Sequence, residues 1–172
     1  MKRYKLSGFT IIEIQITLGI ISIISVAIIT TLNPAKIARQ SRDGIRISEL
    51  ADLNKAITVF KTQQSNTNLG DPNTIYVSVP DPSAAPNATT SCGGVNLQTL
   101  PSPWQYQCSG TNDFLRVDGR GWLPINFASV RVFSLTKLPI DPINNASTGL
   151  FYSYVNGSYV ITAALESQKF LK

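Results

Sequence analysis

The chain has 172 residues, a length that suits one domain with one long additional element. Charged residues make up only 15% of it, below the quarter or so that is typical of soluble domains. It contains no histidine, which excludes Ser-His-Asp and Cys-His nucleophile pairs and His-ligated metal sites. No other nucleophile–base or metal motif is recognisable, so we expect no catalysis, no cofactor and no metal ion.

The formal net charge is +5, but it is unevenly distributed. Lys2, Arg3 and Lys5 supply three of these charges, so the rest of the chain carries only +2. This excess is too small to indicate a nucleic-acid-binding protein.

Residues 9–32 form an apolar run in which Glu13 carries the only formal charge. As a helix the run would be about 36 Å long, enough to cross a hydrocarbon core of roughly 30 Å. The three cations upstream predict that the N-terminus stays cytoplasmic. In a secretory signal the small residue at the cleavage site follows the apolar core, whereas here Gly8 precedes it.

Glu13 has two interpretations from its position alone. It lies near the start of the predicted helix, where headgroups and the helix N-terminus tolerate a carboxylate. Alternatively it is a pairing group, since a charge in a membrane helix usually has a partner. If the chain is cut after Gly8, the amine of Phe9 on a neighbouring subunit could be that partner.

The string G-F-T-I-I-E at residues 8–13, after a basic leader and before a long apolar helix, resembles the class III leader of type IV pilins and of type II secretion pseudopilins. The resemblance implies cleavage by a prepilin peptidase between Gly8 and Phe9 and N-methylation of Phe9. It also implies that Glu13 sets assembly register by pairing with a neighbour's N-terminus. Gln15 departs from the family, which usually has an aliphatic residue there.

The same resemblance implies an α+β pilin fold, in which a long N-terminal helix packs on a small antiparallel sheet. It divides the chain into a leader (1–8), a membrane or filament-core helix (9–32), an amphipathic continuation (33–61) and a β-rich head outside the membrane (62–172). The protein would sit in the bacterial inner membrane before assembly and in a periplasmic or surface filament afterwards.

The expected partners are the prepilin peptidase, identical or related pilin subunits, the inner-membrane assembly machinery and membrane lipid. Nucleic acid is a partner only if the filament is of the competence type. The sequence does not choose between a pilus, a secretion pseudopilus and a competence filament. The alternative function is a membrane-anchored surface binding protein that never polymerises.

Pro34 interrupts the helical pattern, because it has no amide hydrogen and disfavours helix at Asn33. It predicts a kink, or the first position of a second helix. Beyond it, apolar residues recur with helical spacing and predict a face that packs on the sheet. These residues are Ile47, Leu50, Leu53, Ile57 and Phe60.

Cations recur along the same segment, with Asp43 among them. We interpret this basic run as a solvated face; the alternative is contact with anionic headgroups or with acidic groups on other subunits. The cations are Lys36, Arg39, Arg42 and Arg46.

Turn-rich sequence begins at Thr62, after which short β-type runs alternate with loops. Residues 75–79 are one predicted strand, and Asn156-Gly157 predicts a hairpin turn between residues 151–155 and 158–165, with one aromatic face exposed. Cys92 and Cys108 are expected to form a disulfide outside the membrane; the alternative is two free buried thiols.

The sequence L-P-I-D-P at residues 138–142 and the hairpin after it resemble the Asp-Pro loop and final hairpin of small pilin-like proteins. In major pseudopilins the corresponding loops often bind calcium. Asp141 and Glu166 alone do not provide the six to eight oxygens, roughly, that calcium prefers, so we expect no calcium site.

Overall fold

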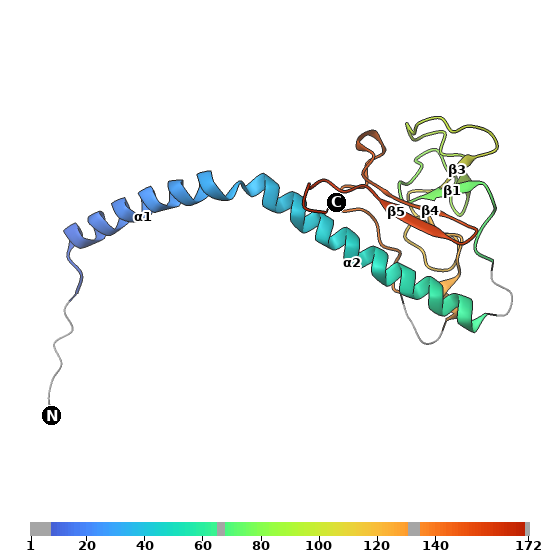
Figure 1. Cartoon of the computed structure of the whole chain (residues 1–172), viewed down its shortest axis with the longest axis horizontal. Helices are drawn as coiled ribbons and strands as arrows, with labels where there is room; N and C mark the ends of the chain where they lie inside the picture. The colour runs from blue at the N-terminus through green and yellow to red at the C-terminus, as the bar shows by residue number, and fades with distance from the viewer. Residues whose placement is uncertain (1–7, 65–67, 131–134, 171–172) are drawn as a thin grey trace, which may run out of the picture.

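The computed structural model describes residues 8–64, 68–130 and 135–170, with only the backbone described at 30–32. Two helices, α1 and α2, run end to end as a bent shaft, and a small head packs along α2 while α1 projects away from it (Figure 1). The elements are α1 (Ile11–Leu32), α2 (Pro34–Gln63), β1 (Thr74–Val77), β2 (Thr89–Thr90), β3 (Gln105–Ser109), the 3-10 turns η1 (Phe127–Ser129) and η2 (Ala146–Thr148), β4 (Tyr152–Val155) and β5 (Val160–Ala163).

The shaft is interrupted at a single residue. Asn33 adopts a left-handed conformation with φ 42° and ψ 80°, which Asn tolerates better than most residues. Pro34 follows in the first turn of α2, where its fixed φ is favourable and its missing N–H costs nothing. The Asn33 Oδ1 accepts a hydrogen bond of 3.2 Å from the Lys36 N–H. Both interpretations of Pro34 therefore apply, since the chain breaks before it and a second helix starts at it.

The C-terminal part of α2 supplies its side of the core. Leu53, Ala56, Ile57 and Phe60 lie at i, i+3, i+4 and i+7 and are all buried. Leu50 packs against this cluster only partly, and Ile47 is 45% exposed. The predicted apolar face is thus confirmed from Leu53 onward, whereas the residues that the head buries nearer the start of α2 are charged, Asp43 and Arg46.

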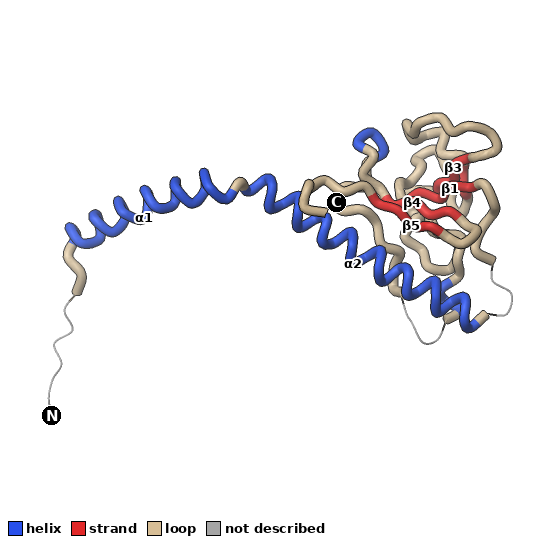
Figure 2. Tube along the Cα trace, viewed as in Figure 1, coloured by secondary structure: helices blue, strands red, loops and turns tan. Residues whose placement is uncertain are grey.

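The five-stranded sheet has the order β2-β3-β1-β4-β5 and lies against α2 (Figure 2). Three of its four pairings are antiparallel, but β1 and β3 are parallel, with Thr74 opposite Gln105. The expectation of a purely antiparallel sheet is therefore wrong. Residues 78–104 make a crossover long enough for a parallel pair, which a tight hairpin cannot form.

The two faces of the sheet are covered differently. Tyr76, Tyr152 and Tyr154 point toward α2 and are buried with Trp122 and Leu138. A second, smaller cluster contains Val77 and the two cysteines. The expected exposed aromatic face of the hairpin is thus wrong, because α2 covers the tyrosines.

The predicted hairpin forms between β4 and β5, but its loop is longer than two residues. Val155 pairs with Val160, so residues 156–159 form the loop, with Gly157 at φ 110°. Tyr159 at the end of this loop contacts α2, where its hydroxyl hydrogen-bonds Asn54 Oδ1 at 2.7 Å. The contact of Tyr159 with α2 is the reason that the loop extends beyond Asn156 and Gly157.

Other apolar segments of the head enter the core without forming strands. Residues 114–117 and 121–126 form no strand and η1 is a single 3-10 turn, yet Leu123, Ile125 and Phe127 are buried. Residues 131–134, which follow this segment directly, lie outside the described residues.

Candidate functional site

The candidate site is α1 with the residues just before it. This helix is long and apolar enough to cross a membrane over Ile11–Ile29, and none of that window is buried within the chain. Its 22 residues span about 33 Å, close to the roughly 30 Å of a hydrocarbon core. An exposed apolar surface this large is typical of a helix that contacts lipid or other protein chains.

The polar side chains of α1 are mostly satisfied inside the helix. The hydroxyls of Thr17, Ser22 and Ser25 donate to the carbonyls of Ile14, Leu18 and Ile21 at 2.8–2.9 Å. Such back-bonding lets hydroxyl groups sit in an apolar medium. Gln15 differs, because its side-chain amide makes no hydrogen bond to any described residue and remains free for another helix.

Gly8 and Phe9 lie in an irregular segment before α1. Phe9 is 84% exposed, and no atom lies within 4 Å of the position where a Cβ on Gly8 would stand. Thr10, the N-cap, is extended with φ −81° and ψ 154°. The Gly8–Phe9 peptide is therefore accessible and outside the helix, as a peptidase substrate must be, while residues 1–7 lie outside the described part.

Glu13 takes part in a capping box with Thr10. Its Oε2 accepts hydrogen bonds of 2.8 Å from both the Thr10 N–H and the Thr10 hydroxyl, and its own N–H donates to Thr10 Oγ1 at 3.3 Å. The other carboxylate oxygen, Oε1, makes no hydrogen bond to any described residue. One oxygen thus caps the helix while the second is available to an outside group.

This cap is a role for Glu13 that the sequence analysis missed. The signal was present as Thr10-x-x-Glu13 directly before an apolar run, which is the pattern of a capping box. The placement of Glu13 near the helix N-terminus was expected, but its hydrogen-bonded pairing with Thr10 was not.

Five charged residues attach the head to the first half of α2, and we call them the charge cluster. They are Arg42, Asp43, Arg46, Asp141 and Glu166. Arg46 is completely buried and binds Asp141 through two hydrogen bonds, of 2.6 and 2.9 Å. Its third nitrogen donates to Asp43 at 2.7 Å and to Glu166 at 2.8 Å. Arg42 binds both oxygens of Glu166, at 2.6 and 2.7 Å.

The charge cluster joins three distant parts of the chain. Asp43 also accepts the backbone N–H groups of Glu166 and Ser167, and Asp141 accepts that of Ile143. The interpretation of the basic run as a solvated face is therefore wrong for Arg42 and Arg46, which are used inside their own chain. Both carboxylates considered for calcium, those of Asp141 and Glu166, are occupied by guanidinium groups.

The charge cluster makes the stability of the head sensitive to acid. Burial opposes ionisation of Asp43, but hydrogen bonds from Ser167, Glu166 and Arg46 outweigh it and lower its pKa to about 2. Hydrogen bonding from Arg42 and Arg46 likewise lowers the pKa of Glu166 to about 2, from an ordinary 4.5. Depressed carboxyl pKa values add stability that is complete above the unfolded-state pKa and is lost as pH falls through the folded one.

We therefore expect the head to lose stability between pH 4.5 and about pH 2. Urea unfolding of the full chain in detergent micelles at a series of pH values measures this. A midpoint independent of pH over that window would contradict the prediction.

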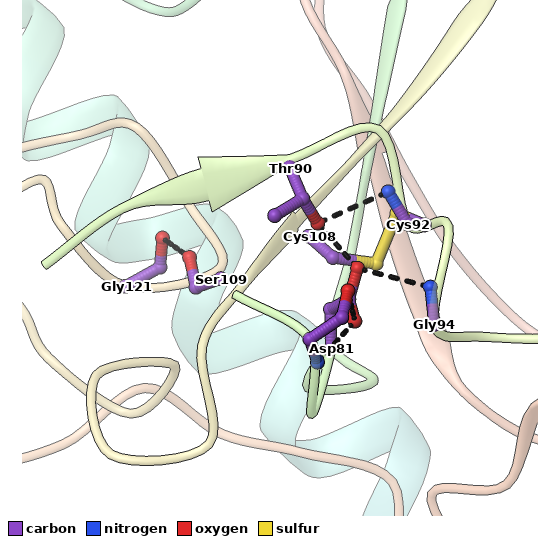
Figure 3. Close-up of a disulfide and its surroundings, with 8 residues drawn as sticks. Asp81, Thr90, Cys92, Gly94, Cys108, Ser109 and Gly121 are labelled. Atoms are coloured by element: carbon purple, nitrogen blue, oxygen red, sulfur yellow. Dashed lines mark hydrogen bonds between the residues drawn. A yellow bond between two sulfur atoms is a disulfide. The ribbon is translucent and has the colours of Figure 1, made fainter. Parts of the chain in front are cut away.

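Cys92 and Cys108 form a disulfide, as expected, with a Cα–Cα distance of 5.1 Å. Closing a loop of this size stabilises the fold by about 3 kcal/mol. Figure 3 shows that the fully buried Asp81 lies beside this bond and accepts hydrogen bonds from Thr90 Oγ1 and the Gly94 N–H.

Asp81 is a second residue that the sequence analysis missed. Burial opposes ionisation of this carboxyl, but hydrogen bonds from Ser83, Thr90 and Gly94 lower its pKa to about 2. The signal was the sequence Asp81-Pro82-Ser83, since Asp commonly accepts the N–H two residues ahead, as it does here at 2.8 Å. Its role is to hold the disulfide loop in place.

Comparison of the chain with protein-family models, curated proteins and solved structures finds no match. The structure defines an α+β protein with one N-terminal helix that could cross a membrane, a second helix and a disulfide-containing head on a mixed sheet.

Proposed function

We propose that this chain is a structural subunit of a type IV pilus-like or type II secretion pseudopilus filament. A prepilin peptidase would cut it between Gly8 and Phe9 and methylate Phe9, and the α1 helices would then pack together as the filament core. The observation that supports this most is the G-F-T-x-x-E string at the start of an apolar helix. Gly8, Phe9 and Thr10 precede α1, Glu13 lies in its first turn, and none of the window Ile11–Ile29 is buried against the head. No catalytic role is proposed.

The two helices differ in what they contact, and this difference also supports assembly through α1. Among the described residues, the head packs on α2 through the apolar face and the charge cluster, whereas none of the Ile11–Ile29 window of α1 is buried against it. Subunits that meet through such a helix in head-to-tail fashion form an open filament. Before assembly the protein would cross the inner membrane once with its N-terminus cytoplasmic.

A second candidate is a membrane-anchored surface binding protein that never polymerises. The capping box favours it, because Thr10 gives Glu13 a function within its own chain and removes the need for a neighbour. The cap leaves Oε1 of Glu13 available to a neighbouring amine. A variant that removes the charge of Glu13 but keeps the cap therefore distinguishes the two candidates.

Replacing Gly8 with Val tests the processing step. The leader should stay attached, because a branched side chain replaces the small residue at the cut, and the product should keep its full precursor mass in cells with an active prepilin peptidase. The matched control is Gly44→Val, a glycine of α2 whose Cβ position is equally open. A processed product from Gly8→Val would place the cut elsewhere.

A further inference from the structure

A cavity of about 460 Å³ lies at the start of α2, beside the junction with α1. Its walls are the first turns of α2, with Asn33, Lys36 and Arg39, and the C-terminal segment 166–168. Figure 1 shows the described C-terminal segment, in dark red, passing alongside this part of α2. The charge cluster fixes this wall, because the N–H groups of Glu166 and Ser167 donate to Asp43.

The cavity carries uncompensated positive charge. Lys36 and Arg39 are exposed, and their side chains make no ion pair with any described residue. The one carboxylate in the wall, Glu166, has both oxygens bound by guanidinium groups. The N-terminus of α2 adds a partial positive charge, and Gln168 adds a neutral hydrogen-bonding group.

The position of the cavity indicates what occupies it. Lys36 and Arg39 lie four and seven residues beyond Leu32, or roughly 6 and 10 Å along a helix. With α1 in a bilayer, that depth falls at the edge of the hydrocarbon core and in the headgroup layer, where lipid phosphates lie. Arginine binds phosphate through two parallel hydrogen bonds, and lysine adds a point charge.

We propose that this cavity binds the phosphate group of an anionic phospholipid in the leaflet where α1 ends. The bound lipid would hold the junction at the membrane surface while the subunit is unassembled. This requires α1 to lie in a bilayer but requires neither cleavage nor polymerisation. It can therefore fail while the filament proposal holds, or hold while that proposal fails.

The test uses the full chain in nanodiscs of phosphatidylcholine with and without phosphatidylglycerol, and native mass spectrometry counts the lipids that stay bound. Each cation near an anionic surface contributes roughly a factor of five. The variant Lys36→Gln/Arg39→Gln should thus retain phosphatidylglycerol about 25-fold less well. The control Lys55→Gln/Lys137→Gln removes the same charge from exposed positions outside the cavity.

Selective retention of phosphatidylglycerol by the wild-type chain and the control, with loss in the cavity variant, supports the proposal. Equal retention by all three chains, or equal loss in both variants, overturns it.

A competition experiment distinguishes lipid from soluble anions. Excess inorganic phosphate is added to the wild-type nanodiscs, and chloride at the same ionic strength is the control. If phosphate displaces the lipid and chloride does not, the cavity is a site for soluble anions and the lipid assignment is wrong. An unchanged urea midpoint shows that the cavity variant is folded.

Discussion

Glu13→Gln should reduce filament assembly more than tenfold while membrane insertion and cleavage after Gly8 stay intact. Removing one partner of a buried, hydrogen-bonded charge pair costs about 2–5 kcal/mol, and about 1.4 kcal/mol is already a factor of ten. Glutamine can still serve in a capping box, so this change removes the charge and keeps the cap. Filaments sheared from cells with the peptidase and assembly machinery provide the measurement.

Two further variants separate the roles of Glu13. Glu13→Ala removes both charge and cap and should lose filaments as Glu13→Gln does, again without loss of insertion or cleavage. Thr10→Val keeps the charge but removes the hydroxyl that bonds to Glu13 at 2.8 Å, and it should assemble almost normally. Normal filaments from Glu13→Gln would refute the register role and leave Glu13 as a helix cap only.

Arg46→Ala should lower the free energy of unfolding of the head by about 3–5 kcal/mol. The substitution leaves Asp43 and Asp141, both completely or almost completely buried, without their cation. Small domains are stable by only about 5–15 kcal/mol, so much of the stability would be lost. Urea unfolding of the full chain in micelles, followed by fluorescence that includes the buried Trp122, measures the change.

Arg46→Lys provides the sharper comparison. It keeps the charge but cannot reproduce the paired hydrogen bonds to Asp141, so its stability should fall between wild type and Arg46→Ala. Lys55→Ala is the surface control, because its pair with Asp52 is exposed and worth about 1 kcal/mol at most. If Arg46→Ala is as stable as Lys55→Ala, the charge cluster does not fasten the head.

The parts of this fold that were predicted from sequence depend on local pattern. The apolar run before Asn33, the helical spacing of Leu53, Ile57 and Phe60, and the hairpin near Asn156 can each be recognised within a short window. The disulfide was predicted as well, because the compartment implied by the N-terminal helix and the presence of only two cysteines leave one intramolecular pairing.

What was not predicted depends on contacts between distant residues. Arg46 and Asp141 are 95 residues apart, and nothing near either residue indicates the pairing. The parallel alignment of β1 with β3 likewise depends on how residues 78–104 cross over. A basic run on a helix usually faces solvent, and here the C-terminal segment and the Asp141 loop cover its second half.

The most direct test of the filament proposal is the intact mass of the protein from its native membrane or sheared surface fraction, with mapping of the N-terminal peptide. The account predicts a chain that begins at Phe9 and carries one added methyl group. A chain that still begins at Met1, from cells with an active prepilin peptidase, would contradict it. The protein would then be a plain membrane anchor for its head.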